Sequence, residues 1–142
     1  MYKILGVKVV SRPTSVGSLK TGQHLVIDGA PYRIVSLEKS KPGKHGSAKA
    51  RIVAINVLDN SKKSIVSPVN AKVDVPIIEK RSAQIVYMEE ASVQLMDLES
   101  YEAFFTSKPS EEDIANQLSL GAEVEYWKVL GTTKIVRVKS PS

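Results

Sequence analysis

The residues best suited to chemistry gather in one short segment, Lys39 to Arg51, which reads Lys-Ser-Lys-Pro-Gly-Lys-His-Gly-Ser-Ala-Lys-Ala-Arg. It holds five lysine and arginine residues, one histidine and no acidic residue. The dipeptide Pro42-Gly43 is a turn signal, and Gly46 frees the backbone beyond it, so Lys44 and His45 are presented at the tip. Concentrated positive charge on an exposed loop attracts nucleic-acid phosphates. The predicted RNA contacts are Lys41, Lys44, Lys49 and Arg51.

Two other interpretations of this segment remain open. Residues 43–47 resemble a nucleotide-binding P-loop only loosely, because the glycine spacing and the Lys-Ser/Thr ending are missing and no helix pattern follows. Taken by itself, Lys44 could also be an ordinary solvated loop lysine. The charge pattern alone therefore favours a basic hairpin loop without fixing a special role for Lys44.

The residue inventory predicts neither a catalytic site nor a metal site. The chain has no cysteine and two histidines, His24 and His45, and neither histidine has a second ligand at metal-binding spacing. His24 lies at the start of a predicted strand, so we interpret it as a structural residue. Turn and helix-dipole roles account for the acidic runs Glu89-Glu90 and Glu111 to Asp113. We therefore expect a protein that is not an enzyme.

The charge is divided unevenly along the chain. Residues 1–74 hold 13 lysine and arginine residues against four acidic residues, a net charge of +9, whereas residues 75–142 carry a net charge of −4. Such a split suggests a basic module that faces a polyanion and a second module with another task. Chance scatter of charge between small domains is the plain alternative.

Nothing in the sequence indicates a membrane protein. No stretch approaches the roughly 18 apolar residues of a membrane span. Lys8 interrupts the apolar N-terminal run, which also lacks a small-residue cleavage site, so we predict no signal peptide. The absence of cysteine fits a cytoplasmic location, which is the default expectation.

The first half shows the signals of a small β-barrel. The dipeptide Asp28-Gly29 between two apolar runs is a hairpin signal. A β-branched run follows the basic segment and ends at a turn, Asp59 to Ser61. The predicted strands are 24–27, 32–37, 51–58 and 64–67.

The second half has the element order of an OB-fold, a five-stranded barrel that often binds oligonucleotides. The junction is expected near Val73 to Lys80, where Pro76 interrupts strand pairing. A helix from Glu111 to Ser119 is predicted, with Ser110 as its N-cap. The predicted strands are 83–88, 92–97 and 101–106 before the helix, and 124–130 and 134–138 after it.

The segment Ser40 to Arg51 resembles the modification loop of the translation initiation factor 5A family in its archaeal form. Further resemblance lies in three short segments, 64–68, 73–78 and 124–127. The similarity runs over nearly the whole chain, and the core Gly43-Lys44-His45-Gly46 is highly specific. Bacterial elongation factor P is a related protein with a third domain.

The resemblance implies an all-β fold, with an SH3-like barrel over residues 1–74 and an OB-fold with one short helix over residues 75–142. It implies that deoxyhypusine synthase transfers an aminobutyl group from spermidine to Lys44, giving deoxyhypusine or, after hydroxylation, hypusine. No other cofactor is implied. The partners implied are the ribosome and the peptidyl tRNA, beside which the factor promotes peptide-bond formation at slow sequences such as proline runs. The remaining loop residues carried over are Pro42, Gly43, His45 and Gly46.

A competing hypothesis is a generic RNA-binding module that works through the OB-fold without any modification. Aromatic side chains could stack on bases there, although the acidic balance of that half argues against it and most of these rings are expected in the core. The aromatic residues concerned are Tyr87, Tyr101, Phe104, Phe105, Tyr126 and Trp127.

Overall fold

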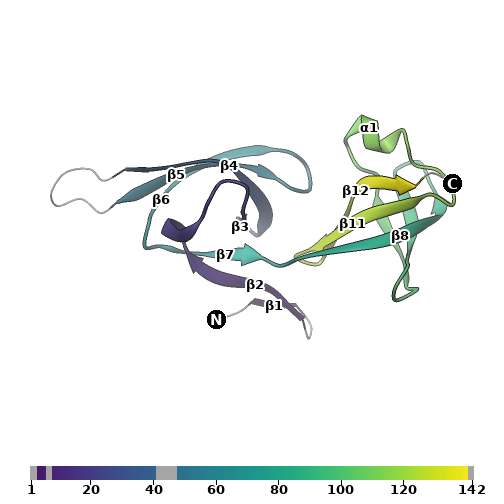
Figure 1. Cartoon of the computed structure of the whole chain (residues 1–142), viewed down its shortest axis with the longest axis horizontal. Coiled ribbons are helices and arrows are strands. Elements are labelled where there is room, and N and C mark those ends of the chain that lie inside the picture. The colour runs from purple at the N-terminus through teal and green to yellow at the C-terminus, as the bar shows by residue number, and fades with distance from the viewer. Residues whose placement is uncertain (1–2, 6–7, 41–47, 141–142) are drawn as a thin grey trace. The chain divides into compact units, whose positions relative to one another are not determined.

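The computed structural model describes residues 3–5, 8–40 and 48–140, and it consists of two compact units (Figure 1). Unit 1 spans Met1–Ile77 and unit 2 spans Ile78–Ser142. The predicted boundary lay between residues 74 and 75, and the units divide shortly after it. Both units are built from antiparallel strands, so the chain is an all-β protein.

Unit 1 is an SH3-like barrel made from two antiparallel sheets. One sheet has the strand order β3-β4-β5-β6 and the other has the order β1-β2-β7. The elements are β1 (Lys3–Leu5), β2 (Lys8–Ser15), the 3-10 turn η1 (Val16–Ser18), β3 (His24–Ile27), β4 (Ala30–Ser40), β5 (Lys49–Asn56), β6 (Lys62–Pro68) and β7 (Lys72–Pro76). Their inward side chains enclose a core that includes Val16, Leu25, Ile34, Ile52 and Ala54.

The predicted hairpin at Asp28-Gly29 is confirmed. Ile27 pairs with Ala30, so the connection between β3 and β4 consists of Asp28 and Gly29 alone. Both have positive φ, 51° at Asp28 and 78° at Gly29. A two-residue turn with two positive φ angles matches the twist of the strands it joins, which is why this dipeptide is a strong signal.

Strands β1, β2 and β7 were not predicted. The sequence of β2 includes Pro13, which lacks a backbone N–H and is a poor strand residue. In the structure, β1 pairs only with Lys8 to Ser11, so β2 lacks that neighbour at Pro13 and pairs there with β7 alone. Strand β7 ends at Pro76, where an interruption of pairing was expected.

Unit 2 has the predicted OB-fold order of three strands, one helix and two strands. The elements are β8 (Ile78–Met88), β9 (Ser92–Asp97), β10 (Ala103–Ser107), α1 (Glu112–Ala115), β11 (Glu123–Val129) and β12 (Thr132–Ser140). The sheet order is β10-β9-β8-β11-β12. The hydroxyl of Thr106 on β10 donates to the carbonyl of Thr133 on β12 at 3.1 Å, which links the two edge strands of the barrel.

The helix is shorter than predicted, and its N-cap is a different residue. It spans Glu112–Ala115, its N-cap position is Glu111, and the cap makes no side-chain hydrogen bond to the helix. The Glu111 carboxylate instead accepts a hydrogen bond from Lys134 Nζ at 2.9 Å, in a pair where the lysine is buried. Bonds of the tighter i−3 type follow at Gln117 and Leu118. They end the helix, and Leu118 packs in the core of the unit.

A buried carboxylate, Asp97, joins three strands of unit 2. It is 2% exposed and accepts hydrogen bonds from Arg81 Nε at 2.6 Å and from Tyr126 Oη at 2.5 Å. The backbone N–H groups of Glu99 and Ser100 also donate to it. The Arg81 hydrogen bond is the main reason why the pKa of Asp97 lies far below its usual range. Burial, followed by the contact with Asp97, raises the pKa of Tyr126 to about 12.

We predict that Asp97→Asn lowers the free energy of unfolding of the protein by about 3 kcal/mol, because it leaves a guanidinium beside a neutral side chain. Because the folded-state pKa of Asp97 is depressed, the carboxylate stabilises fully at neutral pH. That contribution is lost as the pH falls below about 4, where the unfolded chain takes up the proton first. Urea titrations of wild type and variant at pH 7 and pH 3 measure both effects.

The control is Glu90→Gln in the exposed turn before β9, which should change stability by less than about 0.5 kcal/mol. The stability gap between wild type and Asp97→Asn should narrow at pH 3. An equal gap at both pH values would contradict the role given to the ionised carboxylate.

Candidate nucleic-acid interface

The basic segment begins and ends inside a β-ladder. The predicted loop Lys39 to Arg51 is too long, because β4 continues to Ser40 and β5 starts at Lys49. Lys39 pairs with Ala50 in this ladder, and Ser40 pairs with Lys49. Ala50 is completely buried, so the start of β5 is anchored in the core. Sequence reasoning counted this alanine as part of the loop.

The centre of the predicted site lies outside the described residues. This applies to the expected modification site and to its neighbours, so their exposure at the tip of the loop stays a prediction. The residues concerned are Lys41, Pro42, Gly43, Lys44, His45 and Gly46.

Lys49 and Arg51 are both exposed on the outer face of β5. Across the ladders, Arg51 faces Glu38 on β4 and Val66 on β6. No hydrogen bond or ion pair joins the side chains of Arg51 and Glu38, which are both in the described part of the chain. Val66 is 64% exposed, so an apolar side chain lies beside the arginine. This face therefore offers free cations and an apolar contact to a partner.

The same face carries two basic residues at its far end that sequence reasoning did not select. Arg33 pairs with Ile55 on β5, and Ile55 pairs with Lys62 on β6. Both basic side chains are exposed. A register shift between Ile34 and Ser36 brings Arg33 and Glu38 to the same side of β4. A bulge has no clear sequence signal, so this alignment required the structure.

Lys63 is less available to a partner than these residues. Its ammonium forms an ion pair with Asp28 in the β3–β4 turn. The hydrogen bond with this carboxylate is the main cause of the raised pKa of Lys63. The Asp28 carboxylate therefore neutralises the charge of Lys63. The basic residues of the outer face that remain available to a partner are Arg33, Lys49, Arg51 and Lys62.

A network of hydrogen bonds supports the base of the β4–β5 hairpin. Lys39 Nζ donates to the carbonyl of Gly17 in η1 at 2.6 Å. The N–H of Gly17 donates to the carbonyl of Val69 at 2.8 Å, and the N–H of Val69 donates to the carbonyl of Ala48 at 3.0 Å. Hydrogen bonds thus connect both arms of the hairpin to η1, directly from Lys39 and through Val69 from Ala48. Of these residues, Lys39 was noted for its charge and Ala48 only as part of the basic segment, whereas Gly17 and Val69 were not noted.

We predict that Gly17→Ala loosens this base. The added Cβ would lie 3.1 Å from the Val69 carbonyl oxygen and 3.3 Å from the Val69 Cβ, which is closer than normal contact. The Val69 segment must then shift, which weakens its hydrogen bond to Ala48. Hydrogen exchange should show the Val69 amide exchanging about fivefold faster, equivalent to ~1 kcal/mol.

The amides of Leu25 and Tyr32, which pair with each other between β3 and β4, are the internal control and should exchange at the wild-type rate. Unchanged exchange at Val69, or equal acceleration at all three amides, would show that Gly17 does not hold the hairpin base specifically.

The aromatic residues of unit 2 are more exposed than expected. Tyr126 is buried, and its ring centre lies 5.0 Å from that of Phe104. Trp127 is half-buried with Lys80 Nζ 5.0 Å from its ring centre. The prediction of a core location is wrong for Tyr87, Tyr101 and Phe105, which are 49%, 71% and 53% exposed.

Tyr87 and Phe105 form a pair on the outer face of unit 2. Both residues are in register with Gln94 on β9, the strand between β10 and β8. Their ring centres are 6.2 Å apart in an edge-to-face arrangement. Val93 and Leu95 point into the core, so Gln94 between them points outward because side chains alternate along a strand. Tyr87 and Phe105 pair with Gln94 and therefore lie on the same outer face.

The described residues contain no group of three or more histidine, cysteine, aspartate or glutamate side chains that could hold a metal ion. His24 is the first residue of β3 and is half-buried, whereas His45 lies outside the described part of the chain. Among the described residues, no helix is long and apolar enough to cross a membrane.

The chain thus consists of a basic SH3-like barrel with a charged hairpin, followed by an OB-fold. Residues 10–71 match the family described as translation initiation factor 5A-like, N-terminal. Residues 77–139 match the family described as eukaryotic elongation factor 5A hypusine, DNA-binding OB fold. The matches cover both units of the chain.

Individual relatives agree with these matches. Translation initiation factor 5A of Metallosphaera sedula is 51% identical over 89% of this chain and 96% of its own length. The factor of Thermofilum pendens is 52% identical over 92% of this chain and 98% of its own length. A solved structure of eukaryotic translation initiation factor 5A from Methanococcus jannaschii is 42% identical, with a TM-score of 0.82, and covers 98% of this chain and 100% of that chain. The chain belongs to the translation initiation factor 5A family.

Proposed function

We propose that this protein binds the ribosome beside the peptidyl tRNA and promotes peptide-bond formation at slow sequences such as proline runs. Lys44, carrying an aminobutyl group, is the residue through which it acts. The observation that carries the proposal is the sequence Gly43-Lys44-His45-Gly46, which joins β4 to β5 in a chain that belongs to this family. The site of action is the cytoplasm, where ribosomes work.

Lysine has the chemistry that this role needs. Its primary amine accepts an alkyl group, whereas the delocalised guanidinium of arginine is a poor nucleophile. Deoxyhypusine synthase is the proposed partner that transfers the aminobutyl group from spermidine to Lys44. The carbon that leaves the secondary amine of spermidine forms a C–N bond to Lys44 Nζ, and the rest of spermidine departs as 1,3-diaminopropane with the proton that Nζ loses. Four carbons and a second amine extend the reach of the side chain by about 6 Å on standard bond lengths. They also add a second positive charge for the phosphates and sugars of the tRNA end.

The proposed benefit is positional. An extended amine that holds the tRNA acceptor end in place lowers the entropic cost of reaching the reactive geometry, and the ribosome performs the chemistry. The hairpin base supports this function because hydrogen bonds at Lys39 and Ala48 fix both of its arms. Placement of Lys44 and general attraction to RNA are therefore two separable contributions.

Lys44→Arg tests the contribution of placement. The variant keeps one positive charge and a long side chain, but it cannot accept the aminobutyl group. We predict that it still associates with ribosomes, measurably weakened, and loses nearly all stimulation of peptide-bond formation on proline-rich messages. The measurement is in-vitro translation with increasing amounts of modified wild type and of the variant. Equal stimulation at saturation would show that the modification has no such role.

The double variant Lys49→Ala with Arg51→Ala tests the contribution of attraction. Each phosphate contact releases counterions, so the affinity of the wild type should fall steeply with salt. The variant should bind ribosomes more weakly with a shallower salt dependence, and higher protein concentration should restore its stimulation. Lys80→Ala with Lys128→Ala removes the same charge from unit 2 and should leave the salt dependence unchanged. A parallel loss in both double variants would assign the effect to net charge alone.

A second candidate function is RNA binding through the OB-fold without modification. The exposed Tyr87–Phe105 pair is the observation that favours it, since exposed rings are stacking surfaces for unpaired bases. The net charge of −4 on residues 75–142 disfavours the approach of phosphates to this unit. Under this alternative Lys44→Arg keeps full activity, and Tyr87→Ala with Phe105→Ala abolishes RNA binding.

A further inference from the structure

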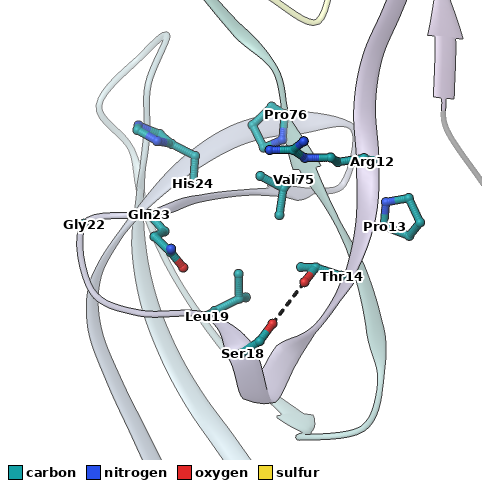
Figure 2. A pocket seen from close by; sticks show the side chains of 10 residues that line it. All are labelled: Arg12, Pro13, Thr14, Ser18, Leu19, Gly22, Gln23, His24, Val75 and Pro76. Atoms are coloured by element: carbon teal, nitrogen blue, oxygen red, sulfur yellow. Dashed lines mark hydrogen bonds between the residues drawn. The ribbon is translucent and has the colours of Figure 1, made fainter.

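Unit 1 contains a cavity of about 590 Å³ between strands β2 and β7 and the segment that leads into β3. This volume lies within the range of small-molecule sites. Figure 2 shows the lining residues, which come from 12–14 in β2, from the segment 18–24 and from 75–76 in β7, and only the last pair is distant in sequence from the others. The cavity includes none of the residues of the hairpin, so it is separate from the interface described above.

The hydrogen bonds within the lining decide what it offers to a ligand. Ser18 Oγ donates to the carbonyl of Ser15 at 2.8 Å, so the Ser18 hydroxyl proton is already used in a hydrogen bond. Thr14 Oγ1, 3.0 Å from Ser18 Oγ, must then donate to Ser18 (Figure 2), and its lone pairs remain as acceptors.

The amide of Gln23 is oriented in a similar way. Its oxygen Oε1 accepts the backbone N–H of Lys20 at 2.9 Å. The NH₂ group of the amide remains as a hydrogen-bond donor. The cavity thus offers an acceptor at Thr14 and a donor at Gln23, which suits a ligand with both kinds of group along one edge.

Arg12 supplies the charge of the cavity. Its side chain is exposed and forms no ion pair or hydrogen bond with any residue that the structure describes. No aspartate or glutamate lines the cavity, so nothing in the lining neutralises the guanidinium. A guanidinium is permanently charged, and its planar fork binds phosphate oxygens in pairs.

The remaining wall is apolar and includes Leu19, Val75 and Pro76. Leu19 is 4% exposed and belongs to the core, so this wall is held in place by packing. An apolar wall beside polar groups of both kinds and one cation matches a flat heterocycle that carries a phosphate.

We propose that this cavity binds a nucleotide. The base lies against Leu19, Val75 and Pro76, its polar edge meets Thr14 and Gln23, and the phosphate binds Arg12. A free nucleotide and a nucleotide unit of a single-stranded RNA share this chemistry. The proposal is independent of the modification of Lys44.

The test is an NMR titration of the ¹⁵N-labelled protein with the four nucleoside 5′-monophosphates, the matching nucleosides and an RNA tetranucleotide. We expect the amide signals of Thr14, Gly22 and Gln23 to shift. Nucleosides should bind about tenfold more weakly than their monophosphates, which is the usual effect of losing a charge-assisted hydrogen-bond pair. Arg12→Gln should weaken the binding of monophosphates by the same factor.

Arg137→Gln is the matched control, because it removes an exposed arginine that belongs neither to the cavity lining nor to the outer face of unit 1. It should leave the binding of monophosphates unchanged. Thr14→Val, which keeps the β-branched shape, is a second variant that should weaken binding independently of charge.

Binding of monophosphates indicates a free nucleotide as ligand, and binding of the tetranucleotide alone indicates RNA; either supports the site. The absence of shifts at the lining residues up to about 10 mM ligand would overturn the proposal. Equal losses from Arg12→Gln and Arg137→Gln would overturn it too, as would inorganic phosphate binding as tightly as the monophosphates.

Discussion

The antiparallel register between β4 and β5 is the constraint on which the candidate interface depends. Because side chains alternate along a strand, burial of Ala50 and Ile52 directs Lys49 and Arg51 outward. A slip of one residue would place Arg51 in the core and expose both apolar neighbours. The packing of the barrel therefore fixes which charges face a partner. It also fixes where the connecting segment that contains Lys44 leaves the barrel and returns to it.

The hairpin base adds a second level of control. Val69 receives a hydrogen bond from Gly17 and donates one to Ala48, so the turn after β6 connects η1 to the start of β5. Lys39 fixes the other arm through the same glycine. A side chain that acts by position needs support of this kind, because disorder at its base would cancel the entropic advantage of holding a tRNA end. Unit 2 has its own anchor in the buried Asp97, which joins β8, β9 and β11.

Local signals made much of the fold predictable. The Asp28-Gly29 turn, the β-branched run of β5 and the order of elements in unit 2 each rest on residues close together in sequence. Features that depend on distant partners were missed. Strands β2 and β7 pair with each other although most of the sequence of unit 1 separates them. The buried Lys134 attracts the Glu111 carboxylate and changes where α1 begins. At the interface, charge revealed Lys49 and Arg51, but only the register showed Arg33 and Lys62 on the same face.

We propose that Lys44 is a modified residue that acts on the tRNA. Mass spectrometry of the peptide containing Lys44, from protein purified from the cells in which it naturally occurs, tests this claim most directly. We predict that Lys44 is heavier by an aminobutyl group, with or without one further oxygen, and that the other lysines are unmodified. An unmodified Lys44 in protein recovered from ribosomes would contradict the claim and favour the generic RNA-binding function.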